Sequence, residues 1–203
     1  MEKFTGLTAK ACPIDIENLN TDQLLPARYL KWPRSNGLGK VLLQDLRFDA
    51  EGREREFPLN RPVWRDAKIV VGRRNFGCGS SREAAVYALY DYGIRCVVAP
   101  SYGDIFAGNA VQNGLLAAIV SDDEAAAMIA TLDAQPEQAV AVDLEAQTIA
   151  CGGKTYRFSI DPVRRMRLLN GWDDIALTES FRPQIAAFKA ADRERRPWAV
   201  PKA

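Results

Sequence analysis

Residues 75–85 read NFGCGSSREAA, which brings glycine, hydroxyl and charged residues together within a few positions. Two glycines flank Cys78, two serines follow, and Arg82 and Glu83 come next. Glycine allows close approach of the backbone to a ligand, and the N–H groups at a helix start favour an anion. An arginine at such a start is best explained by a carboxylate or phosphate held between the guanidinium and the helix end.

A purely structural interpretation of the same residues is also open. Ser80 and Glu83 have the S-x-x-E spacing of a capping box, which stabilises a helix without any further function. That interpretation leaves Gly77, Gly79 and the unfavourable position of Arg82 unexplained. The familiar glycine motifs do not fit either: a dinucleotide fingerprint would need glycine at Arg82, and neither a P-loop nor a nucleophile elbow matches.

The composition excludes several kinds of chemistry. The chain has no histidine, so a Ser-His-Asp triad, a Cys-His dyad and a histidine-metal centre are ruled out. The four cysteines contain no C-x-x-C pair, which argues against a disulfide framework, a zinc knuckle or an iron–sulfur site within this chain. We therefore expect the chain itself to bind no metal and no cofactor; the cysteines are Cys12, Cys78, Cys96 and Cys151.

Charge and hydropathy point to a cytoplasmic protein. The net charge is +1, so there is no general attraction to nucleic acid or to an anionic membrane, and neither is expected as a partner. No apolar run approaches the ~20 residues needed to cross a bilayer. The first 17 residues lack the apolar core of a secretory signal.

The elements that must position the motif follow an alternating pattern. Short β-branched runs at residues 67–72, 95–100 and 115–120 predict buried strands, and helical patterns follow each of them. The helix after the motif has one apolar side and ends at Gly93; its apolar positions are Ala85, Ala88, Leu89 and Tyr92. This order predicts an α/β fold with βαβ units and a mainly parallel sheet.

The last third of the chain has a different pattern. Alternation at residues 139–144 and 155–158 around a Gly152–Gly153 turn predicts a β-hairpin added to the sheet. We expect one domain over residues 1–203, with a core at about 1–160 and a helical tail at about 161–203. Pro183 should lie in the first turn of the last helix, whose buried side should include Ile185 and Phe188.

The sequence NFGCGSSREAA closely resembles the active-site motif of the small subunits of 3-isopropylmalate dehydratase, in the aconitase superfamily. Three other segments are similar to family segments and occur in the family's order. They are NTDQLLPARYL (20–30), VVAPSYGDIFAGNAVQNGLL (97–116) and RRMRLLNGWDDIALT (164–178), so that the resemblance spans roughly residues 14 to 188.

The resemblance implies a swivelling β/β/α domain that works with a separate large subunit carrying a [4Fe–4S] cluster. It implies a hydro-lyase that interconverts 2- and 3-isopropylmalate in leucine biosynthesis, with the cluster iron as Lewis acid on the departing hydroxyl. Two alternatives stay open: a related subunit acting on another alkyl-malate such as citramalate or dimethylmalate, and a non-catalytic anion-binding regulatory module.

The resemblance also assigns roles to particular residues. Ser80 matches the catalytic base, and it would need backbone dipoles and a cation to exist as an alkoxide. Ser81 and Arg82 match substrate-binding positions, and Arg82 is expected to form a bidentate pair with one carboxylate. Asp22 matches a residue that helps to arrange the site, although an Asx-turn role explains it equally well.

A cationic segment, RYLKWPRSNG, corresponds to the family's substrate-covering loop. Arg34 is our choice for a second carboxylate ligand, with Arg28 and Lys31 as the next candidates and Trp32 beside them. Two departures leave the substrate open. Residues 84–89 read AAVYAL where the family has a histidine followed by APWAL, and Trp32-Pro33 replaces a basic residue followed by an aliphatic one.

Overall fold

The computed structural model describes residues 1–199. The chain divides into two compact units, Met1–Gly171 and Trp172–Ala203. Helix α6, expected in the tail, belongs to the first unit, where Leu168 on this helix is fully buried. None of the helices among the described residues is long and apolar enough to cross a membrane.

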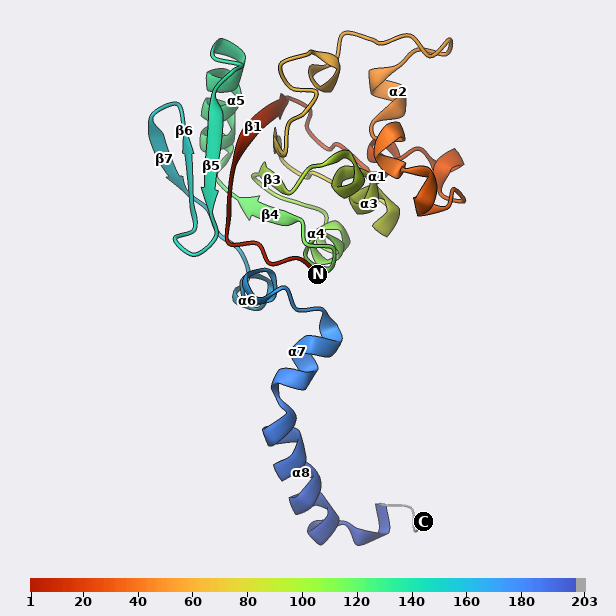
Figure 1. The fold of residues 1–203 in the computed structure, drawn as a ribbon, viewed down its shortest axis with the longest axis vertical. Helices are drawn as coiled ribbons and strands as arrows, with labels where there is room; N and C mark the ends of the chain where they lie inside the picture. Colours follow the sequence, from red (N-terminus) through yellow and green to blue (C-terminus); the bar gives the residue numbers. More distant parts are fainter. Residues whose placement is uncertain (200–203) are drawn as a thin grey trace. The chain divides into compact units, whose positions relative to one another are not determined.

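The first unit is built on one sheet with the strand order β4-β3-β2-β1-β5-β6-β7 (Figure 1). β1 to β4 pair in parallel, and β1–β5, β5–β6 and β6–β7 pair antiparallel, so that five of the seven strands run in one direction. The strands are β1 (Gly6–Ile14), β2 (Ile69–Gly72), β3 (Cys96–Ala99), β4 (Leu116–Ile119), β5 (Ala139–Asp143), β6 (Thr148–Cys151) and β7 (Lys154–Arg157).

Helices connect the parallel strands as the alternating pattern predicted, and the α/β class is confirmed. α3 joins β2 to β3 and α4 joins β3 to β4. The helices of the first unit are α1 (Thr21–Leu24), α2 (Gln44–Arg47), α3 (Glu83–Tyr92), α4 (Asp104–Gln112), α5 (Asp122–Ala134) and α6 (Pro162–Asn170). Short 3₁₀ turns lie at Ala27–Tyr29, Arg34–Asn36, Leu38–Val41 and Pro58–Asn60.

The parallel strands have apolar side chains on both faces, which explains their continuous apolar runs. Val70 and Val97 pack in one core with the buried side of α3, which includes Leu89. Their neighbours Val71 and Val98 face the opposite way, into a second core that contains the buried residues of α5. The helices therefore cover both faces of the sheet (Figure 1).

The antiparallel half has one strand more than the sequence predicted. Residues 148–151 form β6 between the two expected strands, so the arrangement is a three-stranded meander and not a single hairpin. The Gly152–Gly153 turn joins β6 to β7, with positive φ values of 62° and 72°. A tight turn of this kind needs positive φ at both positions, which glycine adopts without a steric penalty.

The second unit contains α7 (Asp174–Ser180), α8 (Arg182–Arg195) and a 3₁₀ turn at Pro197–Ala199. Pro183 lies in the first turn of α8, as predicted. The expectation that Phe188 is buried is wrong, because its side chain is 62% exposed, and Ile185 is only half-buried. Helical periodicity identifies the apolar side of a helix but does not specify what covers that side.

Candidate functional site

Three loops meet at the carboxyl ends of neighbouring parallel strands. They follow β1, β2 and β3, and the loop after β2 carries the NFGCGSSRE motif. The parallel pairing continues beyond the strands as isolated bridges between Asn20 and Cys78 and between Phe76 and Tyr102. Because ligands in open α/β sheets bind at carboxyl ends of strands, this edge is the expected position for a site.

Backbone hydrogen bonds hold the motif between the two other loops. The Gly77 N–H donates to the Leu19 carbonyl at 2.7 Å, and the Gly103 N–H donates to the Phe76 carbonyl at 3.0 Å. On the serine side, the Thr21 hydroxyl donates to the Ser80 carbonyl at 2.9 Å. The path of the motif backbone is therefore fixed from both sides.

A cavity of about 230 Å³ opens between these loops. Both Ser80 and Arg82 line it, which is the arrangement that an anion site at this motif requires. The complete lining comes from all three loops and the start of α4: Thr21, Gly77, Gly79, Ser80, Arg82, Gly103, Asp104, Ile105 and Phe106.

The glycines of the motif are required by its geometry. Gly77 has φ +68°, and a Cβ atom there would lie 2.3 Å from Cγ of the Phe106 ring. Gly79 has φ +94°, a conformation that L-residues rarely adopt, although nothing nearby would block a side chain. Gly77 therefore permits close packing, and Gly79 permits the turn that brings Ser80 to the cavity.

Three aromatic rings form the base on which the motif rests. Phe76 packs edge-on against both Phe106 and Tyr102, at ring-centroid distances of 5.5 and 6.3 Å. The Tyr102 hydroxyl lies 2.8 Å from the carbonyl oxygens of Val97 and Ala118, and burial raises the pKa of this phenol. Tyr102 thus stays neutral and ties the loop to β3 and β4.

The capping-box interpretation of Ser80 is not supported by the structure. α3 begins at Glu83 with Arg82 at the N-cap, and no side chain caps this helix end. A true capping box occurs elsewhere, at Ser121 and Glu124 at the start of α5. Since Ser80 precedes the N-cap by two residues, its hydroxyl does not serve the helix start.

Arg82 forms an ion pair with Asp22 across the cavity edge. The Asp22 carboxylate accepts from Nη1 of Arg82; the arginine side chain is 18% exposed and the aspartate 53%. Asp22 is placed by α1, whose start is fixed by a capping box between Asn20 and Gln23. The structure thus brings Ser80, Arg82 and Asp22 together, whereas Ser81 is exposed and lies next to the lining residues.

The cations of the predicted substrate loop lie away from the cavity lining. Nε of Arg34 donates to both carboxylate oxygens of Asp91 at 3.1 Å, and Nη2 donates to one of them at 2.7 Å. Arg28 is paired with Asp45. Within residues 1–199, Lys31 has no acidic partner.

Trp32 also belongs to this loop. Its ring packs edge-on against Tyr29 at a centroid distance of 4.8 Å, and it stays 41% exposed. The side chain therefore presents an apolar surface next to the exposed Lys31.

Sequence reasoning missed part of the cavity wall. Thr21, Gly103, Asp104 and Ile105 were not predicted as site residues, yet all four line the cavity. Asp104 and Ile105 open α4 after β3, so the rule that sites form at carboxyl ends of strands could have identified them. No sequence pattern marks Thr21, which is identified only by the hydrogen bond from its hydroxyl to the Ser80 carbonyl in the folded chain.

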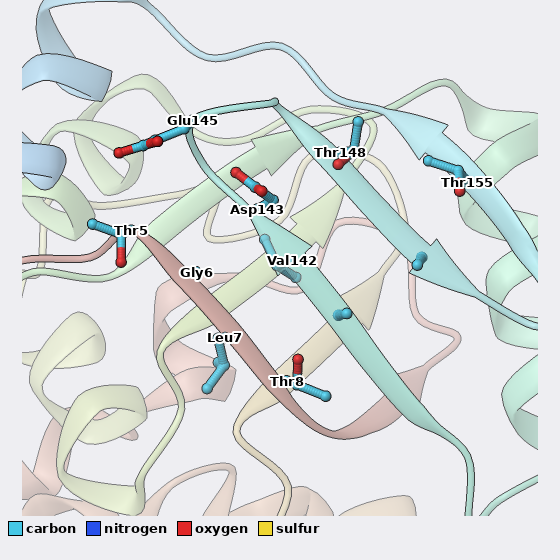
Figure 2. Close-up of a pocket in the computed structure, with 11 residues that line it drawn as sticks. Thr5, Gly6, Leu7, Thr8, Val142, Asp143, Glu145, Thr148 and Thr155 are labelled. Atoms are coloured by element: carbon cyan, nitrogen blue, oxygen red, sulfur yellow. The ribbon is translucent and has the colours of Figure 1, made fainter.

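A larger hollow of about 720 Å³ lies on the antiparallel half of the sheet (Figure 2). Its lining includes threonines such as Thr8, the aliphatic side chains of Leu7 and Val142, and the carboxylates of Asp143 and Glu145. The described residues that line this hollow include no cation to offset the two carboxylates, whereas the smaller cavity has Arg82 as well as Asp104 in its lining. The smaller cavity at the motif therefore remains the candidate site.

Ligands for a metal were also sought in the part of the chain that the structure describes. No group of three or more histidine, cysteine, aspartate or glutamate residues there could hold a metal ion. Cys12, Cys96 and Cys151 are buried, and burial raises the pKa of the Cys12 and Cys96 thiols, which disfavours the thiolate form that metals bind.

The fold is an α/β module whose NFGCGSSRE motif lines a cavity at the carboxyl edge of the parallel strands, and the comparisons agree with this fold class. Residues 1–122 match the family described as the Aconitase C-terminal domain, and residues 126–162 match the family described as LeuD_N.

Individual relatives identify the family more closely. The chain is 48% identical to the 3-isopropylmalate dehydratase small subunit of Rhodospirillum centenum, over 98% of this chain and 100% of the relative. It is 44% identical to that of a Jannaschia species, with the same coverage. A crystal structure of 3-isopropylmalate dehydratase (leuD) from Methanocaldococcus jannaschii matches with TM-score 0.65 and 25% identity, covering 91% of this chain and 99% of that one. The chain belongs to the family of 3-isopropylmalate dehydratase small subunits.

The close contact at Gly77 leads to a stability prediction. Gly77→Ala combines a disfavoured φ with a clash against Phe106, so it should lower the free energy of unfolding by about 2–4 kcal/mol in urea denaturation. Gly108→Ala is the control, because that glycine lies in α4 and a Cβ atom there would meet nothing within 4 Å; it should be neutral or stabilising by up to about 1 kcal/mol. Equal effects of the two variants would contradict the proposed packing.

The absence of a cap at α3 leads to a second prediction. Ser80→Ala should change the free energy of unfolding by less than about 0.5 kcal/mol, because no cap hydrogen bond is lost. Ser121→Ala should cost about 0.5–2 kcal/mol, because it removes the cap of α5. Urea denaturation of both variants checks this, and a larger loss for Ser80→Ala would restore the capping interpretation.

Proposed function

We propose that the chain is the small subunit of a hydro-lyase that interconverts 2- and 3-isopropylmalate, a step of leucine biosynthesis, and that it is active only with a large subunit. The observation that carries the proposal is the shared cavity of Ser80 and Arg82, within a chain that is 48% identical to a named small subunit. A cavity edged by a cation and a hydroxyl suits a hydroxy-dicarboxylate.

In this proposal Ser80 takes the proton from the carbon next to the departing hydroxyl. A serine hydroxyl is a very weak base, so the reaction requires an environment that favours its alkoxide. The Arg82 guanidinium on the same cavity supplies positive charge, and the turn at Gly79 brings Ser80 to the cavity. In the return step Ser80 gives the proton to the carbon that lost the hydroxyl, while water adds at the neighbouring carbon, and the alkoxide form of Ser80 is restored.

Arg82 would hold one substrate carboxylate, with Ser81 as a further hydrogen-bond donor. Asp22 engages Nη1 of the guanidinium, which leaves Nε and Nη2 to face a carboxylate. The ion pair would thereby orient the planar group before the substrate binds. This gives Asp22 a role in arranging the site, as the family resemblance implies.

The loop that carries Lys31 would contribute to the second carboxylate and to the alkyl group. Of the three cations considered for this loop, Arg28 and Arg34 each have an acidic partner in this chain, so we assign Lys31 to the substrate. Exposed Trp32 beside it offers an apolar surface for the branched alkyl end of the substrate.

We place the [4Fe–4S] cluster on the large subunit. The donor chemistry of this chain does not suit a cluster, because three of its four cysteines are buried and the described residues form no metal-binding group. When bound to the partner, the cluster would supply a Lewis acid for the hydroxyl that leaves. This chain would supply the base and part of the carboxylate clamp.

A substrate panel on the reconstituted pair of subunits tests the assignment. We expect turnover of 2- and 3-isopropylmalate to exceed that of citramalate and dimethylmalate. The reverse order would move the chain to another alkyl-malate. No turnover of any of the four would favour a regulatory anion-binding module.

Ser80→Ala tests the role of the base. This variant should lower kcat by about 10²- to 10⁴-fold in the turnover assay. Its association with the large subunit, measured by gel filtration, should stay intact.

Arg82→Lys tests the carboxylate clamp. A lysine keeps the charge but loses the planar fork, so kcat/KM should fall by about 10- to 100-fold in the same assay. Asp22→Asn is the matched control, because it removes the ion pair and keeps the guanidinium; it should have a smaller effect. Unchanged kinetics of Arg82→Lys would exclude Arg82 from substrate binding.

A further inference from the structure

Residues 25–42 form a loop, here called the 25–42 loop, whose two ends are fixed beside the candidate site. The Leu43 N–H donates to the Leu24 carbonyl at 2.9 Å, and both leucines are fully buried. Leu24 ends α1, the helix that carries Thr21 and Asp22. The loop therefore starts one helical turn from the cavity and returns to the same place.

The loop is attached to α3 at two further points. A Cβ on Gly39 would lie 2.4 Å from the Tyr92 nitrogen and 2.5 Å from the Asp91 carbonyl carbon, so the loop backbone rests directly on the last turn of α3. Arg34 makes the second attachment. Its guanidinium forms three hydrogen bonds with the Asp91 carboxylate and lies 4.3 Å from the centre of the Tyr87 ring.

The partners of Arg34 belong to one stripe along α3 that starts at the cavity. Glu83, Tyr87 and Asp91 are spaced four residues apart and therefore share a face of the helix. Glu83 directly follows Arg82 and accepts a hydrogen bond from Asn113 at 3.0 Å. α3 thus connects the cavity arginine at its first end with the 25–42 loop at its last turns.

The Arg34 contact combines several interactions, although the Arg34 side chain itself is 45% exposed. The Asp91 side chain is only 18% exposed, and the aromatic ring stacks on the guanidinium. Desolvation and the hydrogen bond to Glu83 raise the pKa of Tyr87, and the Asp91 hydrogen bond raises that of Arg34, so Tyr87 stays neutral and Arg34 charged. Between the anchors, the loop exposes Leu30 and Trp32 at 42% and 41%.

We propose that Asp91 and Tyr87 act through Arg34 as positioning residues that hold the 25–42 loop against α3. They thereby set how tightly the assembled enzyme captures its dicarboxylate substrate. The proposal rests on the proposed function for its kinetic part only. It assigns Arg34 to the protein scaffold, in place of the direct substrate contact expected from the sequence.

The two roles of Arg34 predict opposite behaviour of Asp91. If Arg34 binds substrate directly, Asp91 competes for the guanidinium, and Asp91→Asn should leave KM unchanged or lower it. If Arg34 positions the loop, Asp91→Asn should reproduce the defect of Arg34→Ala. The KM of the double variant should then be no higher than that of either single variant, because both substitutions remove the same Arg34–Asp91 interaction.

Hydrogen exchange on the full-length free small subunit tests the anchoring without any activity. The amides of Trp32 and Gly37 are suitable probes, since they donate to Tyr29 and Arg34 carbonyls within the loop. Exchange at these amides should accelerate about tenfold in Arg34→Ala and in Asp91→Asn. Glu54→Gln, which removes the exposed Arg65–Glu54 pair, is the matched control and should leave both amides unchanged.

Kinetics of the reconstituted enzyme test the effect on substrate capture. Arg34→Ala, Asp91→Asn and the double variant should each raise KM about tenfold, with kcat within about twofold of the wild type. The exchanged pair Arg34→Asp with Asp91→Arg should recover most of the loss, because the interaction is restored with its charges reversed. Tyr87→Phe keeps the aromatic ring that stacks on Arg34, so its KM should stay close to that of the wild type.

The outcomes separate this proposal from the proposed function. An unchanged exchange rate in Asp91→Asn overturns the anchoring itself. Faster exchange with an unchanged KM overturns the link to substrate capture. A raised KM in Arg34→Ala alone, without recovery in the exchanged pair, makes Arg34 a direct ligand. If the reconstituted wild type turns over none of the panel substrates, the proposed function fails, and the exchange rates still decide the anchoring.

Discussion

The candidate site depends on one close contact, between the backbone of Gly77 and the ring of Phe106. At this point no side chain fits, so the chain after β2 can lie directly on the aromatic base and under the loop after β3. Gly103 completes the contact from the other side, because a Cβ there would lie 2.6 Å from the Gly77 carbonyl oxygen. Because this packing holds the motif backbone in place from both sides, Gly79 can keep its positive φ of 94°.

The consequence is a site made by chain segments that are distant in sequence. Thr21 lies 59 residues from Ser80, and the two are joined by a single hydrogen bond. Three parallel strands end at one edge of the sheet, so their loops need only a few hydrogen bonds to assemble a cavity. The helix that follows the motif, α3, also contacts the 25–42 loop, because its residues Tyr87 and Asp91 hold Arg34.

Charge is balanced locally around the site. Arg82 is paired with Asp22, and Arg34 with Asp91, so the chain by itself holds both guanidinium groups in fixed orientations. Because the Arg82 side chain is already held by Asp22, it would lose less conformational entropy when its planar group pairs with a carboxylate. Each of these pairs balances a positive charge with a negative one, which agrees with a net charge of only +1 for the whole chain.

The sequence alone determined the α/β alternation, the strands β2 to β4 and the motif, because buried parallel strands and turn glycines have strong local signatures. It also led to the family, which the relatives confirm. Only the tertiary structure decided that Ser80 caps no helix, that Thr21 and Asp104 belong to the cavity, and that Arg34 is held by Asp91. Those outcomes depend on which loops meet in space, and side-chain partners at such distances leave no pattern in the local sequence.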